Sequence, residues 1–82
     1  MDITEISEYN KVILRSLYLH RTDDGRFVLL RKIDPENTPK GLRKLETDKL
    51  VLIGLIEYSD TEGGLARITN DGVQFVENYL LQ

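Results

Sequence analysis

The stretch "GLIEYSDTEGGLARITNDG", residues 54–72, constrains the fold of this chain more than any other part of its sequence. The segments 55–59 and 65–69 favour strands, and the polar loop 60–64, with two glycines, joins them. Thr69 then stands where a helix N-cap is expected, because its hydroxyl can accept a hydrogen bond from the first turn. The stretch therefore predicts a β-hairpin followed directly by a helix.

A glycine at position 72 is unusual, because it falls at the third position of this last helix, predicted over 70–81. Glycine in a helix costs about 1 kcal/mol relative to alanine. Without a side chain, however, the first helical turn can press against a neighbouring element. We therefore predict close packing of the last helix at Gly72, with Val73, Val76 and Leu80 on its inner face. The alternative is an N-terminal glycine with no packing role.

The first half of the chain predicts a long helix, a turn, a short element and a second turn. Apolar residues at Ile3, Ile6, Ile13 and Leu17 share one side of a helix over 3–20. Turns are predicted at 21–25 and 34–39, which are rich in aspartate, glycine and proline. The segment 26–33 is too short for its periodicity to separate strand from helix, and we favour a short helix.

The segment 39–53 predicts the helix on which the functional interpretation depends. Thr38 and Pro39 form an N-cap and first helical position, and Gly54 is placed to end the helix. The expected inner face consists of Leu42, Leu45, Leu52 and Ile53. The expected outer face consists of Lys40, Arg43, Lys44 and Thr47.

Composition and charge limit the class of protein. The 82 residues are expected to form one domain, 1–82, with a net charge of −3 and no cysteine for a disulfide or thiolate metal site. Residues 26–49 carry seven basic and four acidic residues, whereas the remainder carries four basic and ten acidic residues. No apolar run is long enough for a membrane span, and the acidic N-terminus does not resemble a signal peptide, so a cytoplasmic location is expected.

The sequence gives no support for an enzyme. The single histidine, His20, falls near the end of the first helix, where packing or capping explains it. The acidic pairs lie in predicted loops, and the pair Gly63 and Gly64 lies in a hairpin, away from the strand-to-helix position of a phosphate loop. No catalytic residue, metal ligand or cofactor is therefore predicted.

The order helix, short helix, helix, hairpin, helix resembles the winged helix-turn-helix fold. The motifs that carry the resemblance are "GLIE" at 54–57, a polar wing at 59–64 and "ITNDG" at 68–72. These motifs are similar to those of small regulators of the multiple-antibiotic-resistance and PadR type. The resemblance implies an α+β, mostly α, fold with a three-helix core, a two-stranded wing and a C-terminal helix.

The resemblance also implies binding of duplex DNA, with the helix 39–53 in the major groove, as in a small transcriptional regulator. The candidate DNA-binding residues are Arg31, Lys32, Thr38, Lys40, Arg43, Lys44, Thr47 and Arg67. For each cation, a solvated face is the alternative. The wing departs from a DNA-binding pattern, because Asp60 and Glu62 would repel phosphate. A winged-helix module that binds another protein, without direct contact to DNA, is the alternative function.

Self-association is a further hypothesis, because winged-helix regulators often pair through their first and last helices. Apolar residues that lie away from the inner stripes of those helices would form a homodimer interface: Val12, Tyr18, Leu19, Phe75 and Tyr79. The alternative is that a small core simply wraps around both sides of the two helices.

Overall fold

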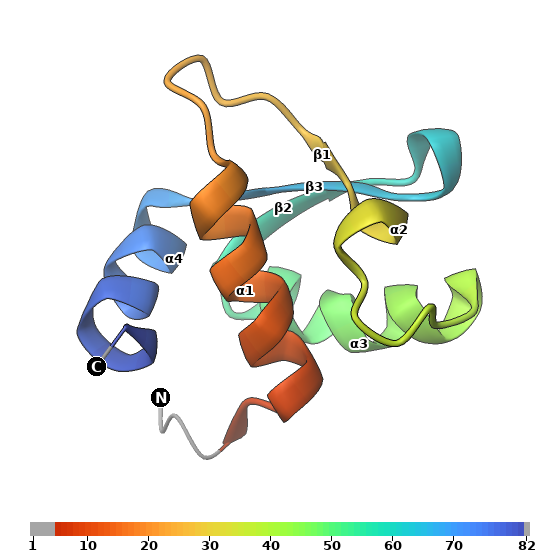
Figure 1. Cartoon of the computed structure of the whole chain (residues 1–82), viewed down its shortest axis with the longest axis horizontal. Helices are drawn as coiled ribbons and strands as arrows, with labels where there is room; N and C mark the ends of the chain where they lie inside the picture. Colours follow the sequence, from red (N-terminus) through yellow and green to blue (C-terminus); the bar gives the residue numbers. More distant parts are fainter. Residues whose placement is uncertain (1–4, 82) are drawn as a thin grey trace.

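The computed structural model describes residues 5–81, which form an α+β, mostly helical arrangement around a small antiparallel sheet (Figure 1). The helices are α1 (Glu8–His20), α2 (Leu30–Ile33), α3 (Lys40–Leu52) and α4 (Asn70–Phe75), and the strands are β1 (Val28–Leu29), β2 (Ile56–Ser59) and β3 (Leu65–Ile68). A 3₁₀ turn over Thr61–Gly63 forms the tip of the hairpin, and a π-helical turn over Val76–Leu80 continues α4. In the described part of the chain, no helix is both long and apolar enough to cross a membrane.

The predicted hairpin is confirmed, and β1 adds a third strand to it. The sheet has the order β1-β3-β2, with both pairings antiparallel. Ala66 at the centre of the sheet faces Val28 on one side and Tyr58 on the other. The predicted short helix over 26–33 is therefore only half right. Pairing with β3 satisfies the backbone of Val28 and Leu29, so the helix is reduced to the single turn α2.

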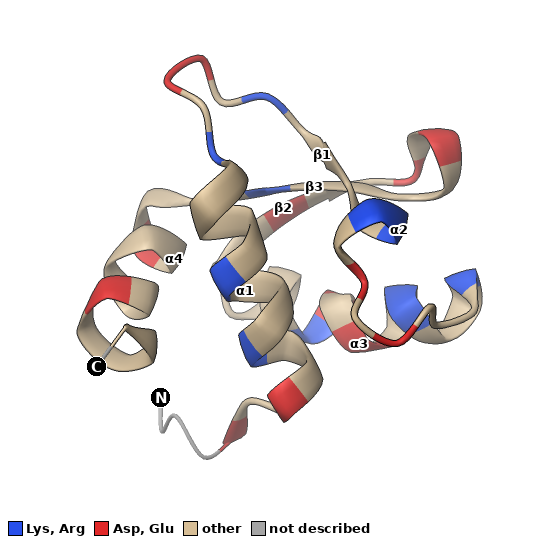
Figure 2. Ribbon diagram, viewed as in Figure 1, with Lys and Arg blue, Asp and Glu red and all other residues tan. Residues whose placement is uncertain are grey.

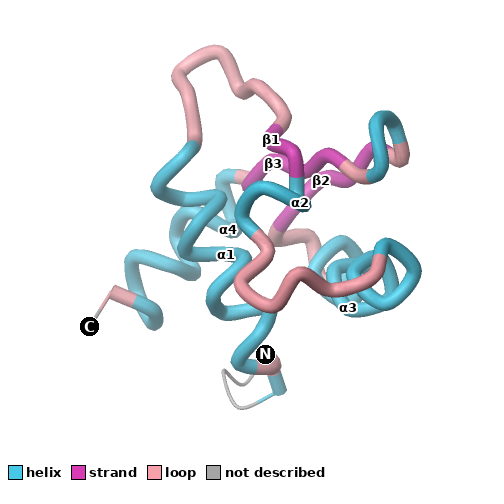
Figure 3. The backbone as a smooth tube through the Cα atoms, turned by 45° about the vertical axis from the view of Figure 1, so that its right-hand side comes forward, coloured by secondary structure: helices cyan, strands magenta, loops and turns pink. Residues whose placement is uncertain are grey.

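The hydrophobic core lies between the sheet and the helices α1, α3 and α4. Its buried side chains are Ile6, Ile13, Leu14, Leu17, Leu30, Leu50, Leu55, Ile56, Ala66 and Val76. Helix α1 crosses the sheet and contacts β3, α3 and α4. Figure 3 shows α3 at one edge of the molecule, below the sheet and the hairpin tip, so one side of α3 is left without a covering element.

Helix α1 begins later than predicted. It begins at Glu8 and not at residue 3, and residues 3 and 4 lie outside the described part of the chain. The Ser7 hydroxyl accepts a hydrogen bond from the Asn10 N–H at 3.1 Å, which caps the helix. This cap explains the start, because it satisfies one of the free N–H groups of the first turn.

Helix α3 ends at Leu52, one residue before the predicted end, and Gly54 terminates it as predicted. This glycine has a φ of 80°, the left-handed conformation that follows many helices. The N–H groups of Gly54 and Leu55 donate to the carbonyl oxygens of Val51 and Leu50, both at 3.0 Å. The pattern is a Schellman motif, and it turns the chain from α3 into β2.

Close packing at Gly72 is confirmed, and it joins the end of α3 to the start of α4. The Thr69 hydroxyl accepts from the Gly72 N–H at 3.0 Å and donates to the Gly54 carbonyl oxygen at 2.7 Å. A Cβ atom on Gly72 would overlap the carbonyl oxygen of Leu55 and lie 2.6 Å from a side-chain carbon of Ile68. Only glycine lets the first turn of α4 sit on this backbone. Below it, the predicted inner residue Val76 is fully buried.

We expect Gly72→Ala to lower the free energy of unfolding by about 2 kcal/mol, because the added methyl group must displace the Leu55 backbone. Gly41→Ala is the matched control, because a Cβ at Gly41 in α3 meets no atom within 4 Å. Alanine there should raise stability by up to about 1 kcal/mol through helix propensity. Urea unfolding followed by circular dichroism measures both. Equal effects of the two substitutions would contradict the packing role of Gly72.

Candidate interaction surface on helix α3

The segment before α3 is organised around the carboxylate of Asp34, whose side chain is fully buried. It accepts hydrogen bonds from the N–H groups of Glu36 at 3.0 Å and Thr38 at 2.8 Å, and from the Thr38 hydroxyl at 3.2 Å. The sequence predicted Thr38 as the N-cap of α3. This prediction is wrong, because the Thr38 hydroxyl donates its hydrogen bond to Asp34. Pro39 occupies the cap position and has no side-chain hydrogen bond.

Arg43 of α3 completes this buried group. Its Nε donates to Asp34 at 3.1 Å, and a terminal nitrogen donates to the carbonyl oxygen of Thr38 at 2.9 Å. The Arg43 side chain is 10% exposed, so both members of the ion pair are shielded from water. Such a pair holds its two segments together strongly, since loss of one partner leaves a buried charge.

The hydrogen bonds also set the charge state of Asp34. Burial alone would raise the pKa of its carboxyl group. The N–H groups of Glu36 and Thr38 and the Arg43 guanidinium outweigh burial, and hold this pKa below its ordinary value of 3.8. Asp34 is therefore ionised in the folded protein at neutral pH.

The predicted faces of α3 are wrong for Arg43 and Thr47, which point inward. Both are buried together with Leu50, at the spacing of one helix face. The Thr47 hydroxyl donates to the carbonyl oxygen of Arg43 at 2.9 Å, so its polarity is satisfied inside the helix. The face that looked polar in the sequence is thus the one that packs.

The predicted inner face of α3 correspondingly points outward. Leu42 is 57% exposed, Leu45 is 60% exposed and Leu52 is 86% exposed. Lys49 lies between the second and third leucines in the sequence and forms an ion pair with Glu46 at 3.3 Å. We call Leu42, Leu45, Lys49 and Leu52 the leucine face. Several exposed leucines on one side of a helix are typical of an interaction site.

Two shallow depressions border the leucine face on the side of α1. The first is lined in part by Tyr9, Leu42 and Leu45, and the second in part by Ile6, Leu52 and Ile53. Ser7 lines both, at the N-terminus of α1. The surface therefore offers a hollow with a mixed apolar and polar lining near each end of α3.

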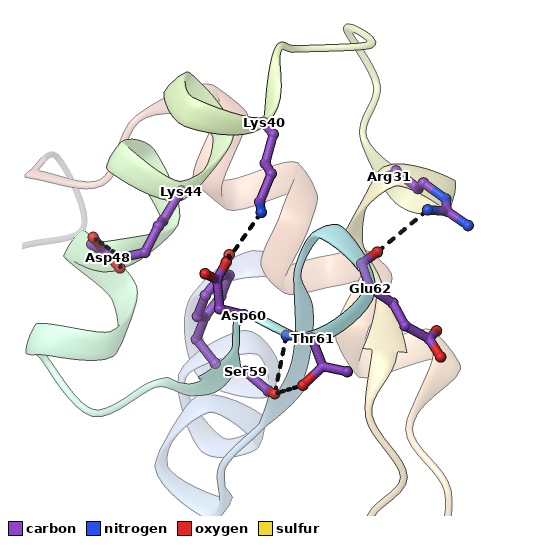
Figure 4. Close-up of polar contacts among 9 residues, drawn as sticks. Arg31, Lys40, Lys44, Asp48, Ser59, Asp60, Thr61 and Glu62 are labelled. Carbon is purple, nitrogen blue, oxygen red and sulfur yellow. Dashed lines mark hydrogen bonds and ion pairs between the residues drawn. The ribbon is translucent and has the colours of Figure 1, made fainter.

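The other side of α3 carries Lys40 and Lys44, and carboxylates pair with both of them. Lys40 lies 3.5 Å from Asp60 at the hairpin tip, and Lys44 lies 2.9 Å from Asp48 (Figure 4). The hydrogen bonds to Asp48 raise the pKa of Lys44. The Lys44 ammonium also lies 5.3 Å from the centre of the Tyr58 ring. The contacts of Lys40 with Asp60 and of Lys44 with Tyr58 tie the basic side of α3 to the hairpin.

The remaining predicted DNA-binding residues are dispersed. Arg31 of α2 is exposed and donates to the carbonyl oxygen of Glu62 at 3.3 Å (Figure 4). Lys32 is exposed on the same turn. Arg67 of β3 pairs with Glu57 at 3.1 Å and donates to the carbonyl oxygen of Gly25 at 2.9 Å. Figure 2 shows the acidic hairpin tip on the same side of the molecule as the basic α2 and the first turn of α3.

The five residues of the predicted homodimer interface differ in exposure. Leu19 is 74% exposed and Tyr79 is 54% exposed. Val12 is half-buried, whereas Tyr18 and Phe75 pack against the core. The Tyr18 hydroxyl donates to Glu77 at 2.9 Å, which joins α1 to the C-terminal turn. For Tyr18 and Phe75, the alternative of a core that wraps around both helices fits the structure.

The leucine face is the feature that sequence reasoning placed wrongly. Its positions 42, 45, 49 and 52 have the spacing of a coiled-coil seam, which is present in the sequence. The interruption by Lys49 was the available signal, since a lysine seldom belongs on a buried face.

Comparison with known proteins adds no family: no family model, curated protein or solved structure matches the chain.

Asp34→Asn should lower the free energy of unfolding by about 3–5 kcal/mol, because it leaves the buried Arg43 guanidinium without its counter-charge. Asp24→Asn is the control, since Asp24 pairs with Arg26 at the surface and its loss should have a much smaller effect. Urea unfolding at pH 7 measures both. Equal stability of the two variants would show that the buried pair does not hold the 34–39 turn on α3.

The same pair predicts a pH dependence. Because the pKa of Asp34 is lower in the folded than in the unfolded chain, its contribution is complete above the ordinary value of 3.8. That contribution is lost as the pH falls through the folded-state pKa. The stability difference between the wild type and Asp34→Asn should therefore shrink on acidification. A difference that stays constant from pH 7 into the acid transition would contradict this assignment.

The orientation of α3 can be tested by substitution of its leucines. Leu45→Gln should change the free energy of unfolding by less than about 0.5 kcal/mol, because the side chain is already exposed and glutamine is a good helix former. Leu50→Ala should cost about 2–5 kcal/mol, because Leu50 is buried. Thermal unfolding of dilute samples measures both. A large loss in Leu45→Gln would mean that Leu45 belongs to the core.

Proposed function

We propose that this chain is a winged-helix module that binds another protein chain through the leucine face of α3. The order of α1, β1, α2, α3, the β2–β3 hairpin and α4 supports the winged-helix assignment, with β2 and β3 as the wing. In this fold α3 occupies the position of the recognition helix. The function of the module therefore depends on what the outward side of α3 offers to a partner.

The exposed leucines carry the proposal. Leu42, Leu45 and Leu52 project from a regular helix that is fixed by Arg43 on its inner side and by the Gly54 turn at its end. A preformed apolar helix face bordered by hollows suits a helix-in-groove or helix-on-helix contact with a protein. It offers few hydrogen-bond donors for the base edges of DNA.

The charges near α3 also favour a protein partner. Lys40 and Lys44 are already paired with Asp60 and Asp48, and Arg43 is buried. Phosphate would have to compete with these carboxylates, and Asp60 and Glu62 of the wing would repel it. Duplex DNA stays the second candidate, and the exposure of Arg31 and Lys32 on α2 favours it.

A titration of ¹⁵N-labelled protein with a mixed-sequence DNA duplex at low salt separates the two candidates. For a protein-binding module, the amide signals of residues 38–52 should stay in place. For a DNA reader, they should move, and the affinity should fall steeply with added salt because bound phosphate releases counterions. Salt-sensitive shifts centred on α3 would overturn the proposal.

Site-specific crosslinking tests the protein contact directly. A photoreactive amino acid at position 45, in cells that make the protein naturally, should yield one discrete protein adduct. The same group at position 74, an exposed site on α4, is the control. The double variant Leu42→Asp/Leu52→Asp should abolish the adduct, because it places charges on both ends of the leucine face. An adduct that survives this change, or no adduct at all, would count against the leucine face.

A further inference from the structure

We infer that the partner of the leucine face is a second copy of this chain, with the two α3 helices packed antiparallel about a twofold axis. This inference rests on the proposed function, and names its partner. Leu42, Leu45, Lys49 and Leu52 follow the spacing a, d, a, d of a heptad repeat, so they form a two-heptad seam along one side of α3.

The seam is complementary to itself in the antiparallel direction. With the twofold axis at the level of position 47, Leu42 lies opposite Leu52 of the second copy. Leu45 then lies opposite Lys49 of the second copy, and the same contacts repeat on the other side of the axis. Three apolar side chains from each copy are covered in this way, and they include the most exposed leucine of the described chain, Leu52.

Lys49 sets the direction of the pairing. In a parallel arrangement, like positions meet, so the two Lys49 ammonium groups would face each other across the seam. In the antiparallel arrangement, the Lys49 stem packs on Leu45 of the second copy, and its ammonium reaches Glu46 of that copy. Lys49 already pairs with its own Glu46 at 3.3 Å, so both charges lie at the edge of the seam. A twofold axis produces two such exchanges.

The two depressions beside α3 fit the same arrangement. One borders Leu42 and Leu45, and the other borders Leu52 and Ile53. Leu42 and Leu52 of an incoming α3 are separated by about 15 Å along the helix axis, from a rise of 1.5 Å per residue. In the antiparallel direction, the incoming Leu52 meets the first hollow and the incoming Leu42 meets the second. Each copy therefore supplies both the protruding leucines and the hollows that receive them.

Sedimentation equilibrium of the purified chain tests the inference. The wild type should show a concentration-dependent monomer–dimer equilibrium. Lys49→Glu should weaken the dimer by about tenfold, because it places a carboxylate beside Glu46 of the second copy. The charge-swapped double variant Glu46→Lys/Lys49→Glu should restore dimerisation. Lys32→Glu, on α2 and away from the seam, is the control and should leave the equilibrium unchanged.

Disulfide trapping tests the direction, and the absence of native cysteine makes it specific. A mixture of Leu42→Cys and Leu52→Cys chains should oxidise mainly to the mixed 42–52 dimer. Predominant 42–42 and 52–52 dimers would overturn the antiparallel arrangement. A wild type that stays monomeric at millimolar concentration, or a charge swap that fails to restore the dimer, would overturn the inference.

These outcomes separate the inference from the proposed function. If the wild type is monomeric but a crosslinker at position 45 captures a different protein, and Leu42→Asp/Leu52→Asp removes that adduct, the leucine face still binds a protein and only self-pairing fails. If duplex DNA shifts the α3 amide signals and position 45 yields no adduct, the proposed function fails as well.

Discussion

The buried ion pair between Asp34 and Arg43 decides which side of α3 faces the solvent. A guanidinium and a carboxylate shielded from water must stay together, because separation would leave each charge without compensation. The pair therefore fixes the rotation of α3 about its axis, with Arg43, Thr47 and Leu50 inward. Leu42 and Leu45, which lie close to Arg43 in the sequence, therefore point away from the core. The exposed leucine face is a consequence of this orientation.

The tip of the β2–β3 hairpin has a structural role that its charge alone does not indicate. Asp60 accepts a hydrogen bond from the Tyr58 hydroxyl at 3.1 Å and lies 3.5 Å from Lys40, so its carboxylate joins the hairpin tip to α3. The carbonyl oxygen of Glu62 accepts a hydrogen bond from the Arg31 guanidinium of α2. The acidic hairpin tip thus engages cations of its own domain. This leaves the polar side of α3 largely committed to internal contacts and the leucine face as its free side.

The elements fixed by local chemistry were predictable from the sequence. Gly54, Thr69 and Gly72 act through backbone conformation, capping and close approach, and each signal lies within a few residues of its effect. The strand β1 was not predictable in this way, because Val28 pairs with Ala66, far along the chain.

The prediction of which side of α3 faces the core failed for the same reason, because it depends on a residue outside the helix. Counting apolar residues on a helical wheel assigns the leucines to the core, as hydrophobicity alone suggests. What outweighs hydrophobicity is the ion pair of Arg43 with Asp34, which lies nine residues earlier. Asp34 belongs to a turn whose fold cannot be read from periodicity. The predicted inner and outer faces of α3 were therefore exchanged at Leu42, Arg43, Leu45 and Thr47. Of the predicted cations, Lys40 and Lys44 are exposed on α3, whereas Arg43 is not.

Helix formation by itself does not account for leucines at these positions. Glutamate, glutamine, lysine and arginine favour helices nearly as well as leucine, and at exposed sites they would keep α3 equally helical. The core does not account for them either, because Leu50 supplies the buried apolar contact of this helix. Leu42, Leu45 and Leu52 therefore contribute little to the isolated domain, and they expose apolar surface that water solvates poorly. A contact that covers them gives this arrangement its physical reason, and a helix with the same spacing, facing the opposite way, covers them most completely.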